Sequence, residues 1–266
     1  MPTALLFDLD GTLIDSAPGV AAALAALAHA RQPAPGAAPG AAPLIDAARV
    51  RPLISLGAGA LVAQALGPLA GDPAADLADF RSLLARQSHL SSPLYPGAAA
   101  ALRGLAGRGV PMAICTNKPA ALAARLLEGW GLAGLFGALV GGDSLGGIAK
   151  PDPAPLRAAM ARLGAGQAVM VGDSIVDARA AAAAAGMDFW LFAKGYGAQD
   201  PALAGVPCAA RFDHHGDVPA LWLRRNAGAA LGENAPIFRS MAKEAGPVPL
   251  VKTLGFRQGQ AQGDAR

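Results

Sequence analysis

The sequence predicts an α/β protein: a Rossmann-like parallel sheet with helices on both faces and an α-helical cap domain inserted after the first strand. From about residue 95 onward, short apolar runs alternate with helical patterns, which is typical of a parallel sheet covered on both faces. One more apolar run, Ala4–Phe7, lies near the N-terminus and ends in an aspartate. Only helical patterns occupy 17–94 between these two regions, so an insertion after the first strand is the simplest architecture.

The N-terminal elements are predicted from local composition. After Ser16 and Pro18, an Ala/Leu-rich segment to about Arg31 indicates a helix, and proline suits its first turn. The segment 33–43, PAPGAAPGAAP, is expected to be a linker or loop because it is unsuited to helix or strand. Further helical patterns cover 44–50, 58–66 and 74–90.

Strands and helices alternate after Tyr95-Pro96-Gly97. The strands are predicted at Val110–Cys115, 138–140, 168–171 and 188–192. The helices are predicted at 97–107, 119–130, 153–163 and 175–185. We therefore expect a core domain made of 1–16 and 95–225, a cap domain over 17–94, and a C-terminal extension over 226–266 with partial disorder.

Length, cysteine content and hydropathy favour a cytoplasmic globular protein. A chain of 266 residues is long enough for a hydrophobic core without staples, and its two cysteines fit a reduced compartment. The mean hydropathy of +0.36 reflects alanine runs that are interrupted before they reach membrane-spanning length. Asp8 and Asp10 lie where the apolar part of a signal peptide would be. We expect a cytoplasmic protein with no membrane partner.

Charge is distributed unevenly along the chain. The net charge is +3, and 224–266 carries seven basic and three acidic residues. The rest of the chain is therefore nearly neutral. Because nucleic-acid binding requires a basic surface on the folded body, we expect no nucleic-acid partner.

The first motif with chemical content is Asp8-Leu9-Asp10-Gly11-Thr12-Leu13. At the end of a strand, Gly11 allows the chain to turn, so both carboxylates can converge on one polar site. Paired carboxylates are costly without a cation, and the pair therefore implies Mg²⁺. The alternative is an aspartate-rich turn without a ligand.

Three later motifs carry candidate partners for these carboxylates. Thr116-Asn117-Lys118-Pro119 opens a predicted helix and offers an anion cradle, although a plain helix cap is the alternative. Lys150-Pro151-Asp152-Pro153 holds a lysine between prolines, where a solvated lysine is the alternative. Gly172-Asp173-Ser174 is followed by Asp177 one helical turn later, and Asp173 could simply cap a helix.

The positions of the four motifs along the chain suggest that they form one site. Asp8, Thr116 and Asp173 each follow a predicted strand directly, and Lys150 lies just before a helix on the same rim. Open parallel sheets bind ligands at the carboxyl ends of their strands. The combination of acids, a hydroxyl and a lysine predicts a magnesium-dependent phosphoryl-transfer site.

These motifs, in this order, resemble the haloacid dehalogenase (HAD)-like superfamily of phosphatases over about residues 3–215. FDLDGTLIDS is its most specific motif, and 17–94 is similar to its α-helical cap. The stretches RPLISLGAGALV, LYPG, TNKP, GGDSL, KPDPAPL and GDSIVDARAAAAAG most resemble the phosphoglycolate phosphatase branch.

The resemblance implies roles for the acidic residues. Asp8 would be the nucleophile and form an aspartyl-phosphate. Asp10 would protonate the leaving group and then deprotonate water. The side chains of Asp8 and Asp173, with the backbone carbonyl of Asp10, would hold Mg²⁺, while Asp177 would orient Lys150 or a metal-bound water from outside the coordination sphere.

The resemblance also implies the reaction. Thr116, Asn117 and Lys150 would bind the phosphoryl oxygens. The expected partner is a small phosphorylated metabolite, 2-phosphoglycolate first. A phosphosugar phosphatase or phosphomutase of the same superfamily is the alternative, and a non-catalytic binding protein is a more distant one. No pattern in the sequence indicates an oligomeric state.

Other features receive lesser roles. Arg51 and the stretch Ser55-Leu56-Gly57-Ala58-Gly59 resemble the cap's specificity loop, although Arg51 could equally be a surface arginine. The loop at 141–147 lacks a P-loop ending. His214-His215 is expected to be a solvated loop, and Cys115 is expected to be buried and inert.

Overall fold

A computed structural model describes residues 3–32, 45–54 and 57–230. A six-stranded parallel sheet lies at its centre, in the order β3-β2-β1-β4-β5-β6. The predicted segment 33–43, Ser55, Leu56 and nearly all of the C-terminal extension lie outside the described residues. The strands are β1 (Ala4–Phe7), β2 (Met112–Cys115), β3 (Ala138–Val140), β4 (Ala168–Gly172), β5 (Met187–Phe192) and β6 (Ala210–Phe212).

The first strand lies in the middle of the sheet. Leu6 of β1 pairs in register with Ala113 of β2 on one side and with Met170 of β4 on the other. All four β1 residues are buried. A strand buried on both faces needs apolar residues at successive positions rather than at alternate ones, which explains the sequence Ala-Leu-Leu-Phe.

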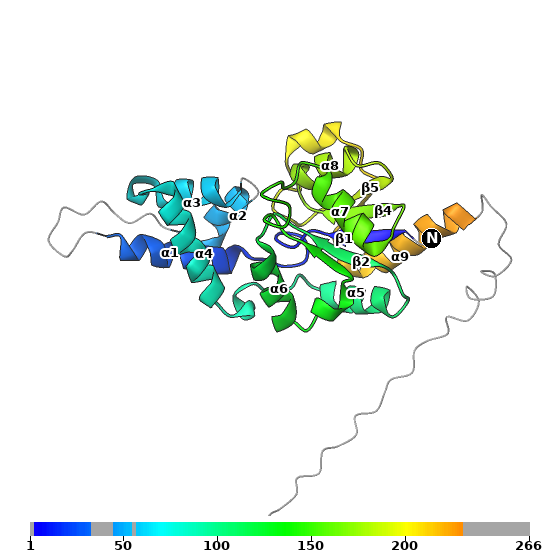
Figure 1. Ribbon diagram of the computed structural model, residues 1–266, viewed down its shortest axis with the longest axis horizontal. Coiled ribbons are helices and arrows are strands. Elements are labelled where there is room, and N and C mark those ends of the chain that lie inside the picture. Colours follow the sequence, from blue (N-terminus) through cyan, green and yellow to red (C-terminus); the bar gives the residue numbers. More distant parts are fainter. Residues whose placement is uncertain (1–2, 33–44, 55–56, 231–266) are drawn as a thin grey trace, which may run out of the picture. The chain divides into compact units, whose positions relative to one another are not determined.

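Helices cover both faces of the sheet (Figure 1). Leu5 and Phe7 belong to a hydrophobic cluster shared with helices on one face, whereas Ala4 and Leu6 belong to a second cluster on the other. The first cluster includes residues of α5 (Ala98–Ala106), α6 (Ala120–Gly129) and α9 (Val218–Ala230). The second includes residues of α7 (Ala154–Leu163) and α8 (Ile175–Ala182). The predicted α/β class is confirmed.

The segment between β1 and β2 begins with helices that pack mainly on one another. They are α1 (Ala17–Ala30), α2 (Ala47–Ile54), α3 (Ala58–Leu66) and α4 (Pro73–Arg86). Leu24, Val50, Leu66 and Phe80 are buried in a third hydrophobic cluster built from these helices. We call α1–α4 the helical segment. Its separate cluster means that its packing is largely independent of the sheet.

The short elements explain several differences from the predicted boundaries. The predicted helix at 74–90 ends at Arg86. A separate 3₁₀ turn at His89–Ser91 follows it, and the Ser88 side chain caps this turn by accepting a hydrogen bond from the Leu90 N–H. Further 3₁₀ turns are Gly67–Leu69, Ala133–Leu135, Pro201–Gly205 and His215–Asp217. β6 was not predicted, because the exposed Arg211 interrupts its apolar residues.

His215 is not the solvated residue that the sequence predicts. Its side chain is 1% exposed and packs against the rings of Tyr95, Phe192 and Phe212. Its Nε2 lies 2.8 Å from the Thr12 carbonyl oxygen, and since a carbonyl only accepts, Nε2 carries the proton. The prediction was wrong because these aromatic neighbours are distant in sequence.

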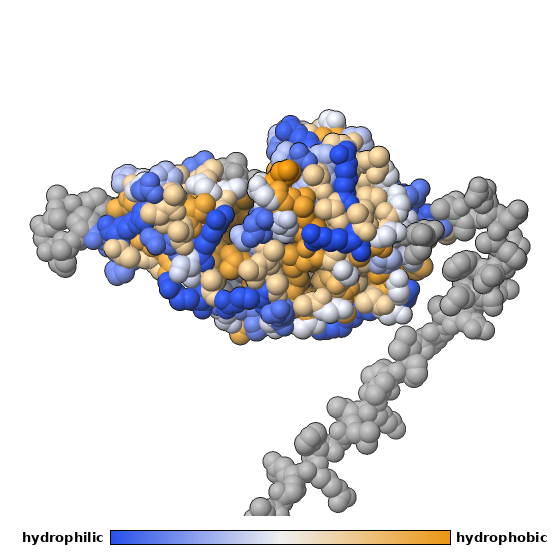
Figure 2. Space-filling view, viewed as in Figure 1, coloured by the Kyte–Doolittle hydropathy of each residue, from blue (hydrophilic) through white to orange (hydrophobic). Residues whose placement is uncertain are grey.

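The described residues up to Asn226 form one compact unit by their contacts. On the face shown in Figure 2, hydrophilic residues are spread over the surface with apolar residues between them. Among the described residues, no helix combines the length and apolar character needed to cross a bilayer.

Candidate active site

The candidate site lies at the carboxyl ends of three neighbouring strands. Asp8 follows β1, Thr116 follows β2 and Asp173 follows β4. β1 lies between β2 and β4 in the sheet, so this is where the connections diverge to opposite sides. Such a divergence leaves a crevice between loops, where open α/β sheets bind ligands.

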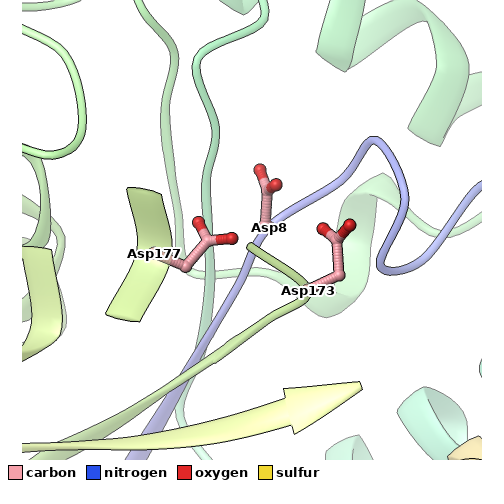
Figure 3. Close-up of side chains that lie close together, drawn as sticks. All are labelled: Asp8, Asp173 and Asp177. Atoms are coloured by element: carbon pink, nitrogen blue, oxygen red, sulfur yellow. The ribbon is translucent and has the colours of Figure 1, made fainter. Parts of the chain in front are cut away.

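Three carboxylates meet in this crevice. Asp8, Asp173 and Asp177 each place one oxygen within 4.8 Å of the others. Figure 3 shows them converging from the end of β1, from the turn after β4 and from the first turn of α8. Like charges at this separation repel strongly in a buried site, so the cluster needs cations or protons to be stable.

Lys150 supplies one positive charge to the cluster. Its Nζ lies 2.6 Å from Asp177 Oδ1 and 3.0 Å from Asp8 Oδ1. Although burial alone would lower the pKa of Lys150, Asp177 and Asp8 raise it above its ordinary value. Lys150 is therefore a permanent cation here.

Asp177 is fully engaged by protein groups. Its Oδ1 accepts from Lys150, and its Oδ2 accepts from Ser174 N and Oγ at 3.1 and 2.7 Å. Ser174 and Asp177 thereby form a capping box at the start of α8. Its carboxylate thus has protein donors on both oxygens, and it sets the position of Lys150.

Asp8 and Asp173 are less well satisfied. Asp8 Oδ1 is buried and forms the 3.0 Å ion pair with Lys150 Nζ, but no hydrogen bond of good geometry from the described residues reaches it. Asp173 accepts from Thr12 Oγ1 at 3.0 Å and from the Gly197 N–H at 3.1 Å. Burial, followed by repulsion from Asp177 and Asp8, raises the pKa of Asp173 to about 8. Burial raises that of Asp8 to about 6 although Lys150 opposes the shift.

These properties fit a hard divalent cation. Carboxylate oxygens are the ligands that Mg²⁺ prefers, and Asp8 and Asp173 each bring a carboxylate oxygen into the cluster. A cation would also favour ionised Asp8 and Asp173, opposing the effect of burial. The donor set is therefore suitable for one metal ion between Asp8 and Asp173.

Asn117 holds the backbone that carries Lys150. Its Nδ2 donates to the Lys150 carbonyl oxygen at 2.8 Å, and its Oδ1 accepts from the Lys150 N–H at 2.9 Å. The side-chain amide is thus occupied by protein, whereas the sequence predicts that it binds phosphoryl oxygens. Thr116 is 4% exposed, and its Oγ1 accepts from the Lys118 N–H at 3.3 Å, which leaves the hydroxyl proton available.

Lys118 is a part of the site that the sequence reasoning missed. Its Nζ lies 2.9 Å from Asp10 Oδ1 and 3.1 Å from Asp10 Oδ2. The Asp10 side chain thus pairs with Lys118 and is not one of the three clustered carboxylates of Asp8, Asp173 and Asp177. The TNKP motif contains Lys118, but its partner lies 108 positions away.

The segment around Tyr196 closes one side of the site. A Cβ on Gly195 would clash with the Asp173 side chain, and one on Gly197 would lie 2.8 Å from Ser174 Cβ. Gly11 has a φ of +81°, and its Cβ would lie 2.6 Å from Asp173 Oδ2. Glycine is required at these positions because the backbone passes directly over the carboxylate.

A cavity of about 230 Å³ opens above the carboxylates. It is lined by Asp8, Asp10, Thr116, Lys118 and Lys150 from the strand ends, and by residues of the helical segment, among them Ile54, Gly57, Leu61, Phe80 and Arg81. The helical segment therefore contributes an apolar wall with one arginine to a polar floor. Gly57 and Gly59 of the predicted specificity loop line the cavity.

Arg51 does not line this cavity. It lies in α2, and its Nη2 donates to Asp15 Oδ2 at 2.7 Å. Tyr196 Oη donates to Asp15 Oδ1 at 2.7 Å and accepts from the Ala17 N–H at 3.1 Å. Asp15 thus joins the helical segment to the segment that covers Asp173.

The order of these elements is the same as in known proteins. A family model described as haloacid dehalogenase-like hydrolase matches residues 2–185. The chain belongs to the haloacid dehalogenase-like hydrolase family. A Rhodospirillum rubrum protein named phosphoglycolate phosphatase is 42% identical to this hydrolase over 217 residues, covering 77% of this chain and 86% of the relative.

Other relatives agree with this membership. A Cereibacter sphaeroides phosphoglycolate phosphatase is 41% identical over 225 residues, covering 82% of this hydrolase and 96% of the relative. A crystal structure from Haemophilus somnus, described as a predicted phosphoglycolate phosphatase, matches with a TM-score of 0.70 at 27% identity, covering 83% and 97% of the two chains. A haloacid dehalogenase-like family protein from Streptococcus pneumoniae shares the fold, with a TM-score of 0.65 at 22% identity and coverage of 83% and 98%.

Proposed function

We propose that the chain is a Mg²⁺-dependent phosphatase that hydrolyses 2-phosphoglycolate to glycolate and phosphate through an aspartyl-phosphate on Asp8. The observation that carries this proposal is the convergence of Asp8, Thr116 and Asp173 at adjoining strand ends, with the Lys150 ammonium beside Asp8. The choice of substrate is supported by the names of the relatives that are 42% and 41% identical.

Asp8 is the nucleophile in this proposal. Its side chain borders the cavity and Lys150 lies 3.0 Å from its Oδ1, which favours the ionised form that can attack. Asp8 and Asp173, with the Asp10 carbonyl, would hold Mg²⁺, which when bound offsets the repulsion between the carboxylate and the phosphate dianion. The carboxylate oxygen bonds to phosphorus as the bond from phosphorus to the ester oxygen breaks.

Asp10 serves both halves of the reaction. It gives its proton to the departing glycolate oxygen in the first step. In the second step it takes a proton from water as the water oxygen attacks phosphorus and the Asp8–phosphorus bond breaks. Free phosphate, the Asp8 carboxylate and protonated Asp10 result, which restores the starting state. Asp10 borders the same cavity as Asp8, as these transfers require.

Thr116 and Lys150 bind the transferred phosphoryl oxygens. The Thr116 hydroxyl and the Lys150 ammonium both border the cavity, and fixed donors at these oxygens stabilise the charge of the transition state. Asn117 and Asp177 keep Lys150 in place through its backbone and its Nζ. We assign these two residues to positioning.

The helical segment is proposed to act as the cap of the enzyme, with 17–94 as cap and 1–16 plus 95–225 as core. Its apolar residues Ile54, Leu61 and Phe80 border the cavity opposite the acids. An apolar cover excludes water, which would otherwise compete with the substrate oxygen for protons. A small phosphorylated metabolite in the cytoplasm is the proposed partner.

Phosphate release from a panel of phosphomonoesters with Mg²⁺ tests this function. We expect 2-phosphoglycolate to give the highest kcat/KM and Asp8→Asn to lower kcat at least 10³-fold. Asp200→Asn is the matched control, because Asp200 is exposed, caps the 3₁₀ turn Pro201–Gly205 and does not line the cavity. A preference for sugar phosphates would favour the phosphosugar alternative, and isomerised product without phosphate would favour a mutase. No Mg²⁺-dependent turnover at all would contradict an enzymatic role.

A further inference from the structure

A second cavity adjoins the first on the side of Asp10. Its volume is about 160 Å³. Ser16, Val20, Leu84, Lys118 and Leu122 line both cavities. A ligand that occupies the first cavity can therefore extend a short group into the second one.

The two cavities differ in charge. The first is bordered by four aspartates and by three cations, Arg81, Lys118 and Lys150. The second is bordered by Lys118, Arg125 and His89, and no acidic residue among the described ones lines it. A cavity with cationic and no anionic groups favours an anion.

Polar groups of the second cavity are also available to a ligand. The Ser16 hydroxyl belongs to a residue that is 1% exposed, and it makes no hydrogen bond to any described residue. A buried hydroxyl without a partner is unfavourable unless a ligand or water satisfies it. Ser88, Ser92 and Gln87 add further polar groups to the lining.

Lys118 connects the second cavity to the proposed chemistry. Its ammonium has three donors, and two of its hydrogen bonds go to the two oxygens of Asp10. One donor remains for a ligand. Because Asp10 would protonate the ester oxygen, a cation beside Asp10 lies next to the group that leaves.

We propose that Lys118, assisted by Arg125, is the specificity-determining cation that binds an anionic group on the leaving alcohol. This inference rests on the proposed function and names its substrate class: phosphomonoesters with a carboxylate bonded directly to the ester carbon. In such a substrate only two bonds separate the ester oxygen from the carboxyl carbon. Lys118 contacts Asp10 and lines both cavities, which places its ammonium beside the acid that would protonate the ester oxygen, where this short anion would lie.

Two esters of equal length provide the test. 2-Phosphoglycolate carries the carboxylate, and 2-hydroxyethyl phosphate carries a hydroxymethyl group in its place. We expect Lys118→Met to lower the ratio of kcat/KM for the first ester over the second by about 30- to 100-fold, because a charge-assisted hydrogen bond is lost. Lys118→Arg keeps the charge and is expected to retain most of the ratio.

Further variants separate this role from others. Arg125→Met leaves the Lys118–Asp10 contact in place and is expected to lower the ratio about 3- to 10-fold. Arg108→Met is the matched control, since Arg108 is exposed and donates to the Gly104 carbonyl. Arg81→Met removes the arginine of the first cavity. Thermal melting verifies that each variant is folded.

The outcomes distinguish this inference from the proposed function. An unchanged ratio in both Lys118→Met and Arg125→Met would overturn the inference, even if the wild-type enzyme hydrolyses 2-phosphoglycolate. Loss of the ratio in Arg81→Met alone would also overturn it, by assigning the carboxylate to the first cavity. If the wild-type protein releases phosphate from neither ester, the substrate class and the inference fail together, while the panel of other esters still tests phosphatase activity.

Discussion

The side-chain amide of Asn117 makes two hydrogen bonds to the backbone of Lys150: its Nδ2 donates to the carbonyl oxygen at 2.8 Å, and its Oδ1 accepts from the N–H at 2.9 Å. The pair fixes the main chain of a lysine whose side chain is buried between two carboxylates. The direction of the Lys150 side chain is therefore set from both ends, by Asn117 at the backbone and by Asp177 at Nζ.

We predict that Asn117→Ala destabilises the ligand-free protein by about 1–3 kcal/mol, because two partly buried hydrogen bonds are lost. Displacement of Lys150 is expected to lower kcat/KM about 10- to 100-fold. Urea unfolding and phosphate release measure the two effects. Thr116→Val is the control, for which activity should fall with little change in stability. An unchanged unfolding free energy in Asn117→Ala would assign its amide to ligand binding instead.

Mg²⁺ is predicted to stabilise the protein more as the pH rises from 5 to 8. In the metal-free protein the pKa of Asp173 is raised from 3.8 to about 8 by burial. Its contribution to stability is present below pH 3.8 and is lost as the pH rises through about 8, whereas a cation prefers the ionised carboxylate. The difference in melting temperature with Mg²⁺ and with EDTA should grow over this interval. It should be smaller and flatter in Asp173→Asn; equal growth there would exclude Asp173 as the source.

Tyr196→Phe is predicted to weaken the link between the helical segment and the segment over Asp173. The variant removes the hydroxyl that contacts both Asp15 and the Ala17 N–H, and we expect a loss of about 1–2 kcal/mol. KM should rise more than kcat falls, because the helical segment borders the cavity. Tyr95→Phe serves as a comparison at the other tyrosine. If KM and stability are unaltered in Tyr196→Phe, the contact between Asp15 and Arg51 is enough to hold the helical segment in place, and this prediction is wrong.

His215 is predicted to make the protein sensitive to acid. Burial lowers its pKa from 6.5 to about 4, so the unfolded chain binds a proton that the native protein excludes. Stability is therefore lost as the pH falls from 6.5 to about 4, by about 3 kcal/mol. Unfolding of His215→Gln should show a weaker pH dependence over this range, although its overall stability is lower. His29→Gln, in α1, is the control and should show the same pH dependence of unfolding as the wild type. If His215→Gln also shows the wild-type pH dependence, His215 is not the source of the acid sensitivity.

The sheet and helices were largely predictable because their residues follow local periods. β1 to β5 coincide with apolar runs, and the carboxyl ends of β1, β2 and β4 carry the residues that meet. Contacts between distant positions were not predictable. Asn117 pairs with a residue 33 positions away and Lys118 with one 108 positions away. A single sequence shows that these residues are polar but gives no indication of which partners they choose.

The place of β1 between β2 and β4 has a consequence for biosynthesis. β1, which Asp8 follows, leaves the ribosome well before its two neighbours in the sheet, Met112–Cys115 and Ala168–Gly172. Until then both edges of an apolar strand lack partners and are open to aggregation. Asp8 is thus translated well before the segment around Gly197, whose amide contacts Asp173. Chains stalled before β4 should depend on chaperones for solubility.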